Sequence, residues 1–291
     1  MQQLDIFADS HDVVLRNAAL DALQRHDAAQ AHASCEALRA ECPHDPTLGA
    51  LDALLDALQQ RGDAAFADHD ALHDAGERLL LRAAPAAQRL FGNDLAGPWL
   101  APLWREVAQR AAHLPFIAAR ADDHAAPAWL LAGDWQAAAD ATANIESWRR
   151  IPAPLGWMSE ARHRLQGLEA IWPLLAELAW LAPARFDALT PRLADPALDK
   201  LRRRFDASFD GEGSIADLAW FPAWLLTEKP ALATHLGAAQ RSRHDAPEQA
   251  LRLMLSLLLL EREGRHRELI ERRKALRDLH AGLWDAYMRT R

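Results

Sequence analysis

The stretch DALQRHDAA, residues Asp21–Ala29, recurs as DALQQRGDAA at Asp56–Ala65, an offset of 35 or 36 residues. A shorter version, GDWQAA, occupies Gly133–Ala138. Each copy joins two alanine- and leucine-rich segments through a polar turn, a pattern that is typical of a helix hairpin. Such amphipathic pairs cannot bury their apolar stripes alone, so the sequence predicts helix hairpins that stack on one another.

These hairpins resemble the tetratricopeptide family, which turns at a glycine, aspartate and aromatic step and places a small residue five positions later. The corresponding turns here are His26, Gly62, Gly133 and Gly264, and the corresponding small residues are Ala31, Ala67 and Ala138. The sequence departs from the family at Leu269, which is not small, and only Pro43 matches the closing proline. The family's early tryptophan and Leu-Gly pair are missing. The resemblance covers residues 11–80, 126–150 and 246–280, and an irregular helical bundle is the alternative.

Strand signals are nearly absent from the rest of the chain, which has one tyrosine and few β-branched residues. Prolines and glycines interrupt the apolar periodicity at helix length. The sequence therefore predicts an all-α protein of about twelve to fourteen helices with antiparallel neighbours, either a tetratricopeptide-like α-solenoid or an irregular helical array. We expect a tail at residues 1–10 and a helical domain at 11–291, which can be subdivided as 11–80, 81–230 and 231–291.

The charge distribution is uneven. The chain has a net charge of −8, so the whole molecule repels nucleic acid at long range. Residues 1–80 contain 15 acids and 5 bases, whereas the segment from Glu261 onward contains 9 bases and 6 acids. The basic run Lys200–Phe205 could contact phosphate, and the bases around Arg272 alternate with acids like a salt-bridged helix face. Direct nucleic-acid binding is therefore not expected.

Cysteine usage and hydropathy indicate the compartment. Cys35 and Cys42 would lie two helical turns apart, roughly 10 Å, which is too far for a disulfide. Two thiols without a signal peptide are typical of a cytoplasmic protein. The longest apolar stretch, Ala250–Leu260, is interrupted by Arg252 and is too short to span a membrane. We therefore expect a cytoplasmic protein that does not enter the membrane.

The amino terminus contains a short sequence with a functional resemblance. Gln3, Leu4, Asp5, Ile6 and Phe7 resemble the peptide by which bacterial replication and repair proteins dock on the sliding clamp. The resemblance implies that Leu4, Ile6 and Phe7 fill an apolar pocket while the Gln3 amide makes hydrogen bonds at its edge. A terminal tail suits this role because it can extend without disrupting the fold. The alternative is that these apolar residues pack on the first helix pair.

Tryptophan is concentrated in the middle of the chain, where ten of the eleven tryptophans lie between Trp99 and Trp224. One interpretation is that they fill a core of irregular helices. The other is a concave aromatic surface that grips a peptide or ligand, because tryptophan is enriched at binding hot spots. The candidates for such a surface are Trp129, Trp135, Trp220 and Trp224.

A histidine pair is the main candidate for catalytic chemistry. His69 and His73 are four residues apart, so on a helix both would lie on one face and could hold a metal. Asp70 stands where the zinc-peptidase helix needs glutamate, and no third ligand is placed by any motif. The structural alternative is that both histidines belong to a solvated helix face. A metal-dependent hydrolase using His69 and His73 is thus the alternative function, while no metal is expected.

Other catalytic signatures are lacking. Four His-Asp steps occur, but three of them precede a helix, where aspartate acts as a cap. Glycine-rich phosphate loops, nucleophile elbows and paired-cysteine zinc motifs are absent from the sequence. We therefore predict a non-catalytic protein–protein interaction scaffold or adaptor without a cofactor, which docks on the sliding clamp through its tail.

Overall fold

The computed structural model describes residues 11–242 and 245–291, so the tail sequence Gln3–Phe7 lies outside the described residues. In the described part every regular element is a helix and no residue is in a strand, which confirms the all-α helical array. The chain divides into two compact units, one reaching Asp134 and the other spanning Trp135–Arg291. The sequence had suggested subdivision at 80/81 and 230/231 instead.

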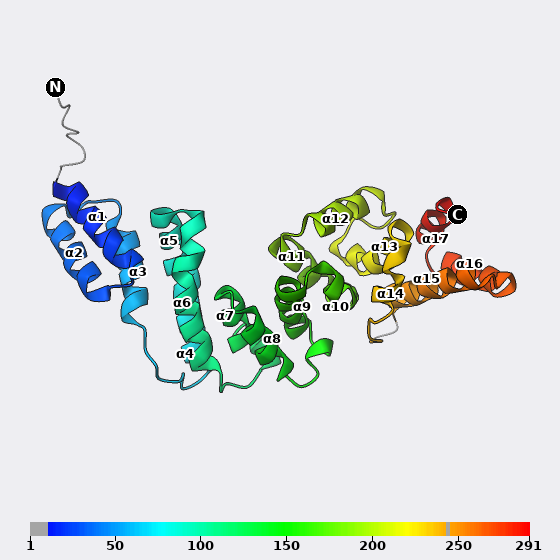
Figure 1. Ribbon diagram of the computed structural model, residues 1–291, viewed down its shortest axis with the longest axis horizontal. Helices are drawn as coiled ribbons and strands as arrows, with labels where there is room; N and C mark the ends of the chain where they lie inside the picture. The colour runs from blue at the N-terminus through cyan, green and yellow to red at the C-terminus, as the bar shows by residue number, and fades with distance from the viewer. Residues whose placement is uncertain (1–10, 243–244) are drawn as a thin grey trace, which may run out of the picture. The chain divides into compact units, whose positions relative to one another are not determined.

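The first unit contains helices α1 to α7 (Figure 1). Their bounds are α1 (His11–Gln24), α2 (Ala28–Glu41), α3 (Leu48–Gln59), α4 (His69–Arg78), a π-helical turn η1 (Leu79–Ala83), α5 (Ala84–Phe91), α6 (Asn93–Ala111), a 3-10 turn η2 (Ala118–Arg120) and α7 (Ala125–Leu131). Helices α1, α2 and α3 lie side by side, and α6 packs against α5 and α7.

The first predicted hairpin has the expected geometry. His26 takes a left-handed backbone conformation (φ 57°) between α1 and α2, and the Asp27 carboxylate accepts a hydrogen bond from the Gln30 amide at 3.0 Å. Ala31 is fully buried on α2, together with Leu23 on α1. The small residue therefore lies in the core of the first unit, as the repeat pattern predicted.

The second predicted hairpin is wrong. Gly62 does not make a tight turn, because α3 ends at Gln59 and α4 begins only at His69. Ala67 is exposed in this connection instead of facing a partner helix. Phe66 is the residue that buries itself: its amide donates to the Arg110 carbonyl at 3.1 Å, and the Arg110 guanidinium covers its ring at 4.1 Å. The large apolar side chain next to the alanine determined how the connection docks.

The second unit contains helices α8 to α17. Their bounds are α8 (Trp135–Ala143), η3 (Trp148–Arg150), α9 (Pro152–Gln166), α10 (Leu168–Leu181), α11 (Pro183–Leu193), α12 (Pro196–Ser208), η4 (Ile215–Trp220), α13 (Phe221–Glu228), η5 (Pro230–Leu232), α14 (Ala233–Leu236), α15 (Ala246–Glu263), α16 (His266–Leu279) and α17 (Ala281–Arg289). Ala138 is fully buried on α8, which packs on α9. Proline is the first or second residue of α9, α11, α12, α13 and α15, where its missing N–H costs no helical hydrogen bond.

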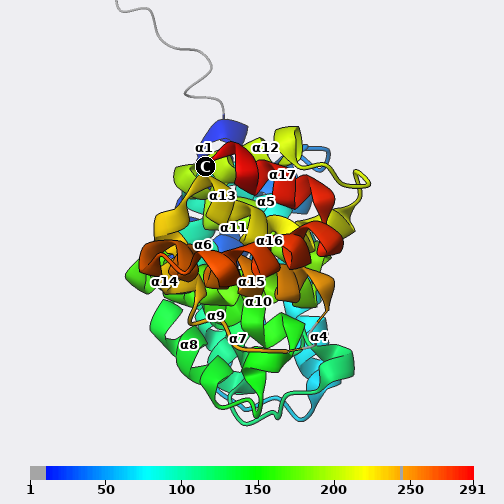
Figure 2. The ribbon, with the colours of Figure 1, turned by 90° about the vertical axis from the view of Figure 1, so that its right-hand side faces the viewer.

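The last hairpin positions the site described below. Gly264 adopts a left-handed conformation (φ 69°) that ends α15, and α16 runs back along it. Figure 2 shows α15, α16 and α17, in orange and red, packed together. Tyr287 of α17 is fully buried and its hydroxyl donates to the Glu261 carboxylate of α15. No helix within residues 11–242 or 245–291 is both long and apolar enough to cross a bilayer.

Candidate partner-binding site

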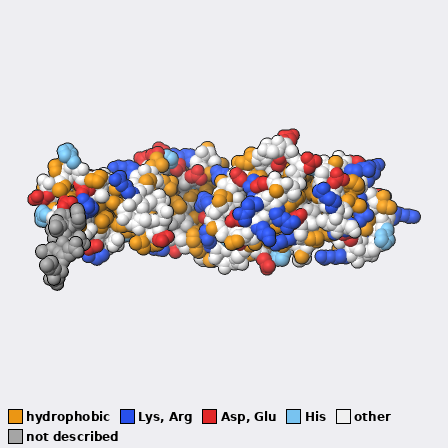
Figure 3. Space-filling model, turned by 90° about the horizontal axis from the view of Figure 1, so that it is seen from above, with side chains coloured by type: hydrophobic (Ala, Val, Ile, Leu, Met, Phe, Trp, Pro, Cys, Tyr) orange, Lys and Arg blue, Asp and Glu red, His pale blue; other side chains and the backbone are white. Residues whose placement is uncertain are grey.

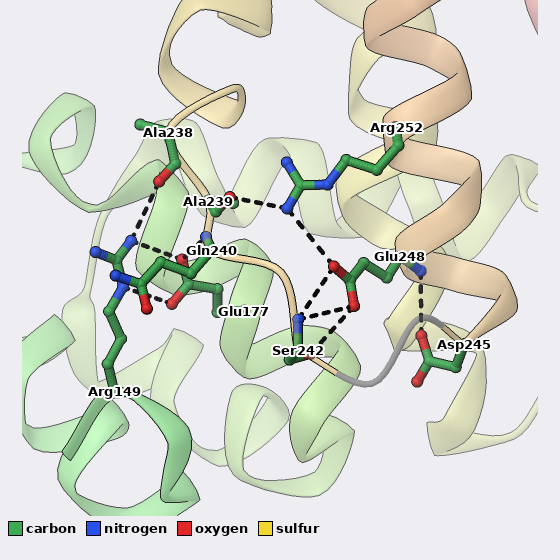
Figure 4. Close-up of polar contacts among 9 residues, drawn as sticks. All are labelled: Arg149, Glu177, Ala238, Ala239, Gln240, Ser242, Asp245, Glu248 and Arg252. Atoms are coloured by element: carbon green, nitrogen blue, oxygen red, sulfur yellow. Dashed lines mark hydrogen bonds and ion pairs between the residues drawn. The ribbon is translucent and has the colours of Figure 1, made fainter. Parts of the chain in front are cut away.

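A loop between α14 and α15 is held in place by a buried glutamate of α10. The Glu177 carboxylate, 3% exposed, accepts hydrogen bonds from Arg149 Nε at 2.7 Å and from Arg149 Nη2 at 2.6 Å. The same carboxylate accepts the backbone amide of Gln240 at 2.6 Å (Figure 4). Arg149 also donates to the Ala238 carbonyl at 3.3 Å. The two-pronged ion pair therefore ties the start of the loop to α10 and to the segment before α9.

A second buried glutamate holds Ser242 of the same loop. Glu248 lies in the first turn of α15 and is 1% exposed. Its carboxylate accepts the Ser242 amide at 3.1 and 3.2 Å and the Ser242 hydroxyl at 3.2 Å. Arg252, one turn further along α15, donates to the Ala239 carbonyl at 2.8 Å and lies 3.6 Å from the Glu248 carboxylate (Figure 4). Asp245 caps the helix by accepting the Glu248 amide at 3.2 Å.

These contacts have a common physical cause. Loop amides lack the partners that a helix supplies, and buried carboxylates need donors, so each satisfies the other. Gln240 and Ser242 are therefore anchored on either side of Arg241. The Arg241 side chain is exposed and makes no hydrogen bond or ion pair with any described residue. The loop thus holds the backbone of Arg241 in place while its guanidinium remains available.

Arg241 lines a groove of about 540 Å³ between α15 and α16. The other lining residues are Glu248, Gln249, Arg252, Leu253, Ser256, Arg272, Ala275 and Leu279. The α15 residues and the α16 residues each recur at three- or four-residue spacing, so they form facing stripes about two turns, roughly 10 Å, long. Leu253, Ala275 and Leu279 make the groove partly apolar, whereas its arginines offer hydrogen-bond donors and positive charge. The volume is in the range of ligand-binding clefts.

The groove has an excess of positive charge. Arg272 is exposed and, like Arg241, forms no hydrogen bond or ion pair within the described parts of the chain. Arg252 is partly compensated by Glu248, the one carboxylate that lines the groove. The Nε of Arg252 is buried without a hydrogen-bond partner among the described atoms. Three guanidinium groups and one carboxylate leave a net charge of about +2, which favours an anionic ligand.

A smaller cavity in the first unit also contains arginines, but most of them have partners. Its volume is about 80 Å³ and its lining includes four arginines, namely Arg61, Arg78, Arg82 and Arg110. Arg61 pairs with Glu106 at 2.9 Å, Arg82 with Asp56 at 3.4 Å, and Arg110 donates to the Ala64 carbonyl at 2.8 Å. Most of its positive charge is therefore already used to hold the surrounding elements together.

The two candidate metal ligands do not converge. His69 is 9% exposed, and its Nε2 donates to the Pro115 carbonyl at 2.8 Å. His73 is exposed and its Nδ1 lies 2.9 Å from the Asp123 carboxylate, which holds the pKa of His73 above its usual value. The prediction that both histidines belong to a solvated face is thus wrong for His69. Among residues 11–242 and 245–291, no group of three potential metal ligands comes together.

The candidate tryptophans occupy different environments. Trp224 is buried in an aromatic cluster with Phe205 and Phe221, so it belongs to the core of the second unit and not to an exposed surface. Trp220 is half-buried and its ring lies 4.5 Å from the ring of His280. Trp129 and Trp135 are also half-buried. A packing role is therefore the better interpretation of Trp220 and Trp224.

The basic run on α12 is partly neutralised. Arg202 pairs with Asp187 at 3.1 Å and with Asp206 at 3.2 Å, and Arg204 pairs with Glu228. Lys200 and Arg203 are exposed. Figure 3 shows lysine and arginine side chains interspersed with acidic ones on the face seen from above. Mixed charges of this kind are typical of a solvated helix face rather than of a nucleic-acid interface.

The sequence does not predict the groove, although two features of the groove are visible in it. Arg252 interrupts an otherwise apolar stretch, and the segment after Glu261 is basic. Neither signal indicates that Arg241, from a loop, joins Arg252 and Arg272 in one groove. No family model matches this chain, and neither a curated protein nor a solved structure matches it.

Proposed function

We propose that this chain is a non-catalytic scaffold that brings two protein partners together, one on its tail and one on its helical body. The observation that carries the proposal for the body is the groove between α15 and α16, which is partly apolar and has uncompensated arginines. Its side chains are suited to binding, because arginine neither accepts nor releases protons at neutral pH. Burial raises the pKa of the Cys35 thiol to about 11, so this cysteine is not a ready nucleophile.

For the tail, we propose docking on a bacterial sliding clamp in cytoplasmic replication or repair. The support is the sequence of Gln3–Phe7 alone. In this proposal Leu4, Ile6 and Phe7 leave water for an apolar pocket, which contributes roughly 1.5–3 kcal/mol per fully buried side chain. Ordering a short peptide opposes this gain, so we expect an affinity of about micromolar, or −8 kcal/mol.

The tail proposal is tested by titrating a bacterial sliding clamp with the full chain and with the isolated peptide of residues 1–10. Both should bind, and Leu4→Ala with Phe7→Ala should weaken binding at least about tenfold, since most of the apolar area is lost. Gln2→Ala, just outside the five-residue sequence, is the matched control and should leave the affinity unchanged.

The melting temperature of each variant distinguishes docking from packing. If the tail is a docking peptide, Leu4→Ala with Phe7→Ala leaves the melting temperature unchanged. Unchanged clamp binding together with a lower melting temperature would instead mean that these residues pack on the first helices, and the clamp assignment would fail.

A further inference from the structure

We infer that the groove between α15 and α16 binds a short acidic peptide segment of a protein partner. In this arrangement apolar side chains of the peptide contact Leu253 and Leu279, while its carboxylates pair with Arg241 and Arg272. The inference rests on the proposed scaffold function, and it names the chemistry of the partner that the helical body receives.

Charge decides in favour of an acidic partner. Arg241, from the loop before α15, and Arg272, from α16, both line the groove. Neither of them pairs with a described carboxylate. Glu248, the one acidic residue in the lining, is already occupied by Ser242 and Arg252. A carboxylate can accept two parallel hydrogen bonds from a guanidinium, so free arginines beside an apolar surface fit a peptide of mixed acidic and apolar residues.

The dimensions decide in favour of a short segment. The facing stripes of α15 and α16 extend for about two turns, or roughly 10 Å, which matches two turns of a bound helix or three to four extended residues. Leu253 and Leu279 are half-buried, so each still has apolar surface to cover. Recognition therefore requires a few residues of the partner and not a large folded surface.

The same lining disfavours nucleic acid. Single-stranded nucleic acid is bound by aromatic side chains on which its bases stack, together with a positively charged track for the phosphates. The described residues that line this groove are aliphatic or polar and include no aromatic ring. The leucines would contribute nothing to phosphate binding, whereas they contribute directly to peptide binding.

The contacts of Gln240 and Ser242 preorganise the groove for binding. Glu177 holds Gln240 and Glu248 holds Ser242, so the backbone of Arg241 is fixed before any partner arrives. Arg252 is held by the Ala239 carbonyl of the same loop. Because less loop ordering remains to be done on binding, more of the interaction energy appears as affinity. Glu177 and Glu248 thus hold the loop that carries Arg241.

The test measures fluorescence anisotropy of a labelled peptide that consists of repeated Asp-Glu-Leu triplets, added to the full chain. We expect saturable binding that weakens as salt rises from about 0.05 M to about 0.5 M. Arg241→Ala and Arg272→Ala should each weaken binding about threefold, and Arg241→Glu with Arg272→Glu at least about tenfold. Arg267→Ala removes an exposed arginine of α16 that does not line the groove and should have no effect.

Two further probes separate the contributions. A peptide with serine in place of each leucine should bind more weakly, because the apolar contact is lost, and a labelled oligothymidylate should not compete. All substituted side chains are exposed, so each variant should keep the melting temperature of the parent chain. Equal peptide affinity in the parent and the double-glutamate variant would overturn the inference, as would displacement by the oligonucleotide at similar concentration.

Failure here is distinguishable from failure of the scaffold proposal. If the groove inference is wrong, the acidic peptide binds elsewhere or not at all, while clamp binding by residues 1–10 is unaffected. If the tail proposal is wrong, the parent chain does not bind the clamp, or binds it equally well after Leu4→Ala with Phe7→Ala. The Arg241 and Arg272 variants still lose the acidic peptide in either case.

Discussion

His69 and His73 lie one turn apart on α4, yet their side chains are stabilised differently. His69 is buried against the Pro115 carbonyl, whereas His73 is exposed beside Asp123. Removing a buried partner leaves a polar group unsatisfied, so His69→Ala should lower the free energy of unfolding by about 1–2 kcal/mol. His73→Ala, the matched control, should change it by about 0.5 kcal/mol or less. Urea denaturation measures both, and equal effects would contradict this assignment.

His124 is the residue whose titration should affect stability. It is 8% exposed, and burial, with a smaller contribution from His69, lowers its pKa to about 4. Its Nδ1 accepts the Ala126 amide at 3.1 Å and so caps α7, which requires that this nitrogen be unprotonated. Protonation would therefore both charge a buried ring and remove the cap.

The sign follows from linkage. Because the pKa of His124 is lower in the folded state than in the unfolded state, the unfolded state binds more protons between about pH 4 and pH 6.5. The contribution of neutral His124 to the free energy of unfolding is complete above the pKa of the unfolded state. This contribution is lost as the pH falls below that pKa. We expect the free energy of unfolding to drop by about 2 kcal/mol from pH 7 to pH 5 because of this group. His124→Asn, which can still cap α7, should reduce that drop in chemical denaturation at the two pH values; an unchanged drop would assign it to other groups.

At the scale of the element, two alanines at equivalent positions of the repeat pattern behave differently. Ala31 is fully buried in the α1–α2 hairpin, whereas Ala67 is exposed between α3 and α4. Ala31→Leu should therefore cost about 1–3 kcal/mol by overpacking. Ala67→Leu should stay within about 0.5 kcal/mol of the parent chain. Thermal unfolding of the two variants measures both effects. A large loss of stability for Ala67→Leu would contradict its exposed position and favour the predicted hairpin, in which Ala67 faces a partner helix.

The difference between these elements explains how far the sequence could predict the fold. A hairpin pattern of local residues describes α1 and α2 well, because Asp27 and Ala31 act within that pair. The α3–α4 connection instead depends on Phe66 and its contact with Arg110 of α6, more than forty residues later. Local periodicity contains no information about such a distant partner.

For the whole molecule, the scaffold proposal predicts two independent binding activities. The tail belongs to the amino-terminal end and the groove to the second compact unit, which has its own core. Leu4→Ala with Phe7→Ala should therefore leave acidic-peptide affinity unchanged, and Arg241→Ala with Arg272→Ala should leave clamp affinity unchanged. Titrating each ligand in the presence of saturating amounts of the other measures any coupling. A change of more than about threefold in either direction would show that the sites are linked.

By itself the sequence determined that the described chain is helical, because helix propensity, proline positions and apolar periodicity act over a few residues. It also contains the whole case for the tail peptide, which depends on five adjacent residues. Only the tertiary structure decided that His69 and His73 have separate partners, and that Arg241, Arg252 and Arg272 share a groove. These arrangements depend on buried carboxylates and carbonyls supplied by other elements, and no local pattern records which distant donor and acceptor will meet.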